Sequence, residues 1–247
     1  MSNSLLVMIA GESTGGKSAS LMNLRNPEGV FYLNTEAMKP LPFPDKFKKL
    51  LSGLNNPNDI FALFNKVEQM DDIHTIVIDS LTFLMEMFES MNVLTASNTM
   101  RAWSDYGQFF KRLMQEVIAK SNKNWIILAH NTAELKEDGT YRYFIPVKGA
   151  LAKTGIEAYF SIVVYARKAP IKELEELEYD PELLRITDRD RAVGYKHVFQ
   201  VDITRKYADS RIRAPMGCWQ PNQLYMDNDA QMLIDHLTQF YGYEPKN

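Results

Sequence analysis

The sequence of 247 residues contains a single cysteine, Cys218. One cysteine excludes both a disulfide framework within the chain and a zinc site built from several cysteines. No segment holds 18 uninterrupted apolar residues, and the first residues lack a basic stretch followed by an apolar core. We therefore expect no membrane partner, no export, and a reducing cytoplasmic environment.

The chain also lacks a large excess of charge of either sign. The formal net charge is −3, so the protein as a whole has no pronounced attraction for a polyanion. Locally the charge is uneven, because residues 171–184 carry one lysine and six acidic residues, whereas residues 185–213 carry eight basic and four acidic residues. The acidic stretch fits a solvated surface, and the basic stretch fits either a solvated loop or a surface that faces phosphate or nucleic acid.

Short apolar runs alternate with amphipathic segments along the chain. We expect strands at 5–9, 30–33, 75–78, 125–128, 160–165 and 197–203, and helices at 18–24, 58–70, from 81, and at 104–120. Asn58 is a candidate N-cap for the second of these helices. Such alternation predicts an α/β fold with a mostly parallel sheet between helices.

One domain is expected to span residues 1–247, with a core at about 5–215 and a helical tail at about 220–247. Residues 132–148 are expected to form a β-hairpin that turns at 137–139, and residues 168–195 a polar excursion.

A glycine-rich segment follows the first expected strand. It fits the pattern G-x-x-x-x-G-K-[ST] and lies between a strand and a helix, which is the context that a phosphate-binding loop requires. Its backbone N–H groups would surround phosphate oxygens, Lys17 would reach the β- and γ-phosphates of ATP, and Ser18 would coordinate Mg²⁺. The predicted nucleotide-binding residues are Gly11, Glu12, Ser13, Thr14, Gly15, Gly16, Lys17, Ser18 and Ala19.

Two carboxylates follow expected strands. Asp79 ends the apolar run 75–78, where an acidic residue of a phosphate-loop fold holds Mg²⁺ together with the loop serine. Glu36 follows the second strand, from which a carboxylate can activate a water molecule. A glutamate that only begins a helix or lies on the surface fits this position equally well.

Polar and aromatic residues follow the fourth strand. His130 ends that strand and could sense the γ-phosphate, although a histidine that merely ends a strand is the simpler interpretation from the residues alone. The hairpin beyond it interleaves aromatic and basic residues, a composition that can stack bases and contact phosphates. Its candidate DNA-binding residues are Tyr141, Arg142, Tyr143 and Lys148, and a hairpin with one face on the protein core is the equal alternative.

Four cations cluster late in the sequence, in "ITRKYADSRIRAP": Arg205, Lys206, Arg211 and Arg213. One or more of them could reach a phosphate in the same or a neighbouring subunit. A solvated basic loop is the alternative.

Four segments, "GESTGGKS", "FYLNTE", "TIVIDS" and "WIILAHN", resemble the RecA-like NTPase core, in that order. They are similar to small phage-encoded AAA/RecA-type ATPases, a group that includes single-strand-annealing recombination proteins. The later "PVKGALAKTGIEAYFSIVVYARK" looks like the segment after that group's DNA-binding loop.

The resemblance implies roles for individual residues. Glu36 would activate water, Asp79 would match the strand-three aspartate, and His130 would be the sensor that links the γ-phosphate to a DNA-binding loop at 131–148. Lys17 and these two partners, Glu36 and His130, form the predicted catalytic set. The four late cations lie near the family's trans-acting cations.

The resemblance predicts an Mg²⁺-dependent ATPase that binds single-stranded DNA in phage recombination or replication, in the host cytoplasm. We expect a homo-oligomer, with a single-strand-binding protein as a further partner. Recombinases of this family have an N-terminal extension that polymerises them, whereas the first strand here begins at about residue 5, so a ring or a DNA-dependent filament is expected. The alternatives are a nucleotide or small-molecule kinase, with a lid near Arg189 and Arg191, and a nucleotide-dependent loader that acts on a protein partner.

Overall fold

The computed structural model describes residues 4–36, 39–49 and 54–246. The strands are β1 (Leu6–Gly11), β2 (Val30–Asn34), β3 (Lys48–Lys49), β4 (Thr75–Asp79), β5 (Asn124–His130), β6 (Thr132–Leu135), β7 (Tyr141–Phe144), β8 (Ile162–Pro170), β9 (Tyr195–Gln200) and β10 (Tyr225–Asp227). The α-helices are α1 (Asp59–Glu68), α2 (Leu81–Phe88), α3 (Thr99–Arg112), α4 (Leu151–Thr154), α5 (Ile171–Glu175), α6 (Asp188–Val193) and α7 (Ala230–Tyr241). No helix among the described residues is long and apolar enough to cross a bilayer.

Eight strands form the main sheet in the order β10-β9-β8-β1-β5-β4-β2-β3. The strands from β8 to β3 are parallel, whereas β9 and β10 are antiparallel to their neighbours. Strand β5 separates β1 from β4, so the ends of β1, β5, β4 and β2 lie along one edge of the sheet. Ligands of open parallel sheets bind at this carboxyl edge.

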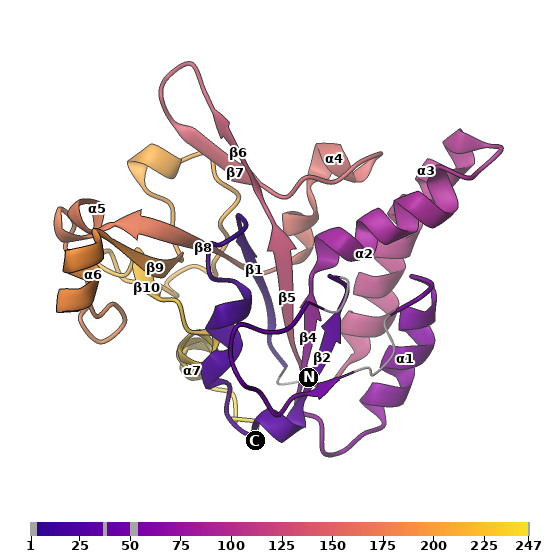
Figure 1. Ribbon diagram of the computed structural model, residues 1–247, viewed down its shortest axis with the longest axis horizontal. Coiled ribbons are helices and arrows are strands. Elements are labelled where there is room, and N and C mark those ends of the chain that lie inside the picture. The colour runs from indigo at the N-terminus through magenta and orange to yellow at the C-terminus, as the bar shows by residue number, and fades with distance from the viewer. Residues whose placement is uncertain (1–3, 37–38, 50–53, 247) are drawn as a thin grey trace.

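Alternate residues of the central strands face two separate hydrophobic layers. Met8 and Ile127 pack with helices α1, α2 and α3, whereas Ile9 and Ile126 pack with α7 on the opposite face. Figure 1 shows these helices on the two sides of the sheet. Cys218 is buried in the layer that contains α7. Because the central strands are covered on both faces, nearly all their residues are buried, as expected of parallel strands.

The predicted α/β fold with a mostly parallel sheet is confirmed. Several local features differ from expectation. The segment after the phosphate loop is a short 3₁₀ helix, η1 (Ser18–Asn23), and Asn58 occupies the N-cap of α1 without a side-chain hydrogen bond to the helix. The side chain of Asn58 donates instead to Asn56 Oδ1, 3.3 Å away.

The chain beyond residue 160 is more regular than expected. Strand β8 runs on to Pro170 and pairs with β9 along six positions, so part of the predicted polar excursion is sheet. The segment 220–247, expected to be helical, contributes the edge strand β10 before α7 begins. A three-residue strand is too short to produce a recognisable alternation of apolar residues.

The expected hairpin is present as β6 and β7, which pair antiparallel, with Gly139 in the turn at φ +79°. Figure 1 shows the hairpin beyond the carboxyl edge of the sheet, above the end of β5. The hairpin follows β5 after a single residue, Asn131, so any shift at the end of β5 reaches it directly.

We expect the central strands to provide much of the stability of the fold. Ile127 on β5 is fully buried, whereas Ile203 is 48% exposed. Ile127→Ala should lower the free energy of unfolding by about 2–5 kcal/mol, because it leaves a cavity in a tightly packed layer. Ile203→Ala, the matched control, should change it by about 0.5 kcal/mol or less. Urea unfolding followed by circular dichroism measures both, and equal effects would contradict the assigned layers.

Candidate active site

Three glycines shape the loop between β1 and η1. A Cβ atom on Gly11 or Gly15 would lie 2.4 Å or 2.6 Å from the carbonyl oxygen of Ala166 on β8, so the loop packs directly on that strand. Gly16 has a φ of +105°, a conformation that side chains disfavour, and a Cβ there would also meet Asn228 Nδ2 at 2.7 Å. The loop therefore needs glycine at these positions for close packing and for its turn.

Lys17 is buried beneath this loop. Its Nζ atom donates hydrogen bonds to the carbonyl oxygens of Gly11, at 2.8 Å, and Glu12, at 3.0 Å. Burial lowers the pKa of Lys17 to about 8, and the nearby carboxylates of Asp79 and Glu36 oppose that shift. The ammonium is thus a largely desolvated donor, and such a group interacts strongly with an anion placed beside it.

Asp79 ends β4 and lies beside the start of η1. Its Oδ2 atom accepts hydrogen bonds from Ser18 Oγ and from Tyr32 OH, both at 2.7 Å. Burial raises the pKa of Asp79, and the hydrogen bonds from Tyr32 and Ser18 oppose that rise. The other carboxylate oxygen, Oδ1, is buried without a hydrogen-bond partner. Asp79 therefore presents an unused oxygen next to a serine hydroxyl.

His130 connects Glu36 to Lys17. Its Nε2 atom lies 3.0 Å from Glu36 Oε1, and its Nδ1 atom lies 3.4 Å from Lys17 Nζ. Since lysine can only donate, Nδ1 is the acceptor, and the ring proton is then on Nε2, where it donates to the carboxylate. Glu36 beyond β2, His130 at the end of β5 and Lys17 at the end of the phosphate loop thus form one continuous chain of contacts.

Two threonines hold these strand ends in place. Thr82 Oγ1 accepts from the backbone N–H of His130 at 2.9 Å, and the Phe83 ring lies edge-on to the imidazole with centroids 5.5 Å apart. Thr35 Oγ1 accepts from Ser80 N and donates to Ser80 O, at 2.8 Å and 2.7 Å. The ends of β2, β4 and β5 are therefore cross-linked by hydrogen bonds directly beneath the polar groups.

Two further residues reach the glycine loop from late in the chain. Asn228 Nδ2 donates to Gly16 O at 2.9 Å, and His197 Nδ1 lies 3.1 Å from Gly15 O. Neither was expected from the sequence, because their positions depend on the antiparallel pairing of β8, β9 and β10. Tyr32 was missed as well, since its place in an apolar run indicates only a buried strand residue.

These groups surround a cavity of about 310 Å³. Its lining includes the loop residues Gly16, Lys17, Ser18 and Ala19, the strand-end residues Glu36, Asp79 and His130, and His197. Pro40, Leu41 and Pro42 add an apolar rim. The cavity thus combines anion donors with an apolar surface, which suits a nucleotide.

The residues fit the predicted cofactors, ATP and Mg²⁺. The glycine loop and Lys17 supply the donors for phosphates, and Ser18 Oγ and the unpartnered Asp79 Oδ1 are the hard oxygen ligands that Mg²⁺ prefers. Within the described ranges, no group of three or more His, Cys, Asp or Glu side chains could hold a metal ion. The metal would therefore be held with the help of phosphate oxygens, as is usual for Mg²⁺ in nucleotide sites.

The predicted DNA-binding residues lie on two faces of the hairpin. Tyr141 and Tyr143 face the protein body, where both rings pack with Tyr207. Arg142 lies on the other face, 3.9 Å from Glu134 and over the ring of Phe144. The structure thus brings the tyrosines together but separates them from Arg142.

Lys148 lies beyond the hairpin, and its Nζ atom pairs with both oxygens of Glu89, at 2.7 Å and 2.9 Å. Of the four late cations, Arg205, Lys206 and Arg213 are exposed. Lys206 lies 3.6 Å from Glu173, and Arg211 donates to the buried Glu157 at 3.1 Å. Within the part of the chain that the structure describes, Arg205 and Arg213 are in no ion pair. These two could therefore reach a phosphate in a neighbouring subunit without first breaking an ion pair.

Comparison with protein-family models adds an independent finding. The model of the AAA domain family matches residues 3–201, which include the glycine loop, Glu36, Asp79 and His130. A comparison with curated proteins gave no match. The matched segment covers most of the chain and all of its candidate site except Asn228, so the chain belongs to the AAA domain family, within the P-loop NTPase class.

Proposed function

We propose that this protein is an Mg²⁺-dependent RecA-like ATPase that binds single-stranded DNA and serves phage recombination or replication. The observation that carries the proposal is the chain of contacts from Glu36 through His130 to Lys17. It joins a carboxylate, a histidine and the phosphate-loop lysine around one cavity. AAA domains are typically nucleotide-dependent ATPases, so the family match supports the hydrolytic part of the proposal.

Each polar residue has a role that follows from its position. Lys17 and the loop N–H groups bind the phosphates, and Ser18 and Asp79 hold the metal. Glu36, whose side chain is only 15% exposed, orients a water molecule and accepts its proton. The hydrogen bond from His130 fixes the carboxylate in one orientation.

His130 also provides the physical link to the hairpin. A phosphate that attracts the Lys17 ammonium would weaken the contact between Lys17 and His130 Nδ1. A resulting shift of the His130 ring would change its hydrogen bond with Glu36. Asn131, the next residue, donates its backbone N–H to Gly11 O at 3.3 Å and leads directly into β6. The nucleotide and the hairpin therefore act on the same short segment.

The hairpin is the proposed single-strand-binding element. Arg142 lies on its outer face with Phe144, so a cation and a ring are available to a phosphate and a base. Arg205 and Arg213 are the proposed trans-acting cations, because both are exposed and outside the nucleotide cavity, whereas the exposed Lys206 is paired with Glu173. Cations that act in a neighbouring subunit require a homo-oligomer, and we propose a ring or a DNA-dependent filament. A single-strand-binding protein is the further partner that we propose.

A loader that acts on a protein is the second candidate function. The connection between α2 and α3 exposes Met91 and Leu94, and the first turn of α3 exposes Met100; exposed apolar side chains often bind proteins. The kinase alternative has less support. Arg191, its proposed lid residue, is paired with Glu175 and Asp188, and neither Arg189 nor Arg191 is among the described residues that line the nucleotide cavity.

ATP hydrolysis measured with and without oligothymidine tests the proposal. We expect hydrolysis that single strands stimulate, and Lys17→Ala should abolish it because the loop loses its ammonium. Lys46→Ala, a matched change at a lysine whose side chain is 74% exposed, should behave like the wild type. Stimulation only by a protein would favour the loader, and phosphate transfer to a second substrate would favour a kinase.

Glu36→Gln separates nucleotide binding from hydrolysis. The amide keeps the size of the side chain but cannot accept a proton, so turnover should fall by about 100-fold or more while ATP binding persists. Glu28→Gln, at an exposed glutamate, is the control. Turnover within a few-fold of wild type would show that Glu36 has a structural role only.

Arg142→Ala tests the outer face of the hairpin. Binding of oligothymidine, measured by fluorescence anisotropy over a range of salt, should weaken, and the slope of log K against log salt should drop by about 1. Arg101→Ala on α3, where the arginine side chain is 81% exposed, should leave both quantities unchanged. If the slope is unchanged in Arg142→Ala, DNA does not contact the outer face of the hairpin, and the basic stretch 185–213 becomes the proposed DNA-binding surface.

A further inference from the structure

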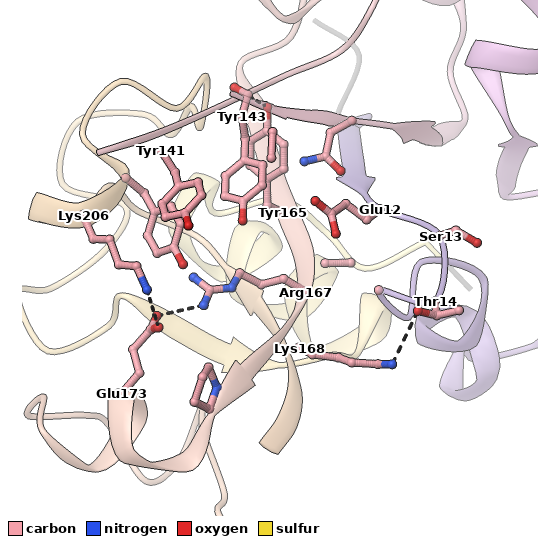
Figure 2. Close-up of a pocket in the computed structure, with 16 residues that line it drawn as sticks. Glu12, Ser13, Thr14, Tyr141, Tyr143, Tyr165, Arg167, Lys168, Glu173 and Lys206 are labelled. Atoms are coloured by element: carbon pink, nitrogen blue, oxygen red, sulfur yellow. Dashed lines mark hydrogen bonds and ion pairs between the residues drawn. The ribbon is translucent and has the colours of Figure 1, made fainter. Parts of the chain in front are cut away.

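A second cavity, of about 350 Å³, shares Ser13 and Thr14 of the phosphate loop with the nucleotide cavity. The loop residues Glu12 and Gly15 form one wall, the hairpin forms another, and the end of β8 forms the floor. Figure 2 shows the labelled side chains gathered around this space. We name it the tyrosine cleft, because Tyr141, Tyr143, Tyr165 and Tyr207 line it.

The rings of the tyrosine cleft are packed against one another. Tyr143 lies nearly parallel to Tyr207, with centroids 5.4 Å apart, and 36° from the plane of Tyr165 at 5.6 Å. Tyr165 and Tyr207 are buried, whereas Tyr141 and Tyr143 remain half-exposed. Tyr165 also donates a hydrogen bond to Tyr143 O. The cleft therefore offers a fixed aromatic wall to a planar ligand.

The charges of the cleft are arranged for an anion. Arg167 is held over the Tyr207 ring at 4.4 Å and donates to Glu173 at 2.9 Å. Lys206 lies over Tyr141 and Tyr207 and beside the same glutamate. Three cations, Arg167, Lys168 and Lys206, thus line the cleft against two carboxylates, Glu12 and Glu173, and this excess of positive charge favours an anion.

Two groups at the side of the loop complete the cleft. Lys168 Nζ donates to Thr14 Oγ1 at 3.4 Å, a long contact that leaves the ammonium available. Asn131 Oδ1 is buried without a hydrogen-bond partner, and Asn131 lines the cleft. An aromatic wall, an unused amide oxygen and two lysines are together the groups that recognise a base and its phosphate.

We propose that the tyrosine cleft binds one nucleotide, with its base against Tyr141 and Tyr143 and its phosphate toward Lys168 and Lys206. The nucleotide could be free or part of a single strand. If the ligand is part of a single strand, this proposal rests on the DNA binding proposed above. If the ligand is a free nucleotide, this proposal is independent of DNA binding. A ligand in the cleft would lie beside Glu12, and it would contact Lys168, which donates a hydrogen bond to Thr14. Its binding would therefore act on two residues of the phosphate loop.

The test uses the full chain carrying Lys17→Ala. This change removes the ammonium that binds phosphate in the nucleotide cavity, so that binding at the tyrosine cleft is measured. Thymidine 5′-monophosphate and a 20-residue oligothymidine are the two probes, and calorimetry measures their binding. Adding Tyr143→Leu should weaken binding at least tenfold, because one stacking surface is lost. Lys206→Gln should weaken it and reduce its salt dependence.

Tyr243→Leu is the matched control. Tyr243 is another half-exposed tyrosine stacked on a neighbour, Tyr241, but at the end of the chain away from the hairpin. It should leave binding unchanged. Thermal melting of each variant verifies folding, and Tyr143→Phe, which keeps the ring, should retain binding if Tyr143→Leu is destabilised.

The outcomes separate the two sources and the two proposals. Binding of the monophosphate that needs Tyr143 supports a free-nucleotide site, even if DNA does not stimulate hydrolysis. Binding of the oligonucleotide alone, again dependent on Tyr143, supports a strand nucleotide. If neither Tyr143→Leu nor Lys206→Gln changes oligonucleotide binding, the cleft proposal is overturned, whereas the proposal that the protein binds single strands still holds. Absence of binding by both probes overturns it too.

Discussion

The carboxylate of Asp79 accepts hydrogen bonds from Ser18 after the phosphate loop and from Tyr32 on β2. A buried carboxylate is costly unless its oxygens are satisfied, and here one oxygen takes both bonds while the other is left over. The two bonds fix β1, β2 and β4 relative to each other at the carboxyl edge. Ser18 after the phosphate loop is thereby held beside the end of β4, and Glu36 extends from β2, the neighbouring strand.

The order of the strands explains why the catalytic candidates meet. Strand β5 lies between β1 and β4, so His130 emerges between the loop lysine and the ends of β4 and β2. The imidazole of His130 has two ring nitrogens, and with them it bridges an ammonium to a carboxylate. A shorter or acceptor-only side chain could not make both contacts at once.

The loop and the strands could be predicted because their signals are local. The glycine spacing around Lys17 and the apolar run that ends at Asp79 each lie within a few residues. His197 and Asn228 contact the loop from 182 and 212 residues away, so no local pattern could reveal them. Arg167 was hidden for a similar reason, since Tyr207, whose ring it covers, follows β9 and comes near only when β9 pairs with β8. The inward orientation of Tyr141 and Tyr143 also depended on tertiary packing, because hairpin alternation defines two faces but does not say which is covered.

The burial of Cys218 has a practical consequence for measuring motion in this protein. Burial raises the pKa of its thiol to about 11, so very little thiolate forms near neutral pH. The native chain is therefore a nearly silent background for thiol-directed probes. A single cysteine introduced at the exposed turn of the hairpin would carry a fluorophore or spin label alone, without replacement of the native residue. Labels placed there would report the position of the hairpin directly as nucleotide is added or removed.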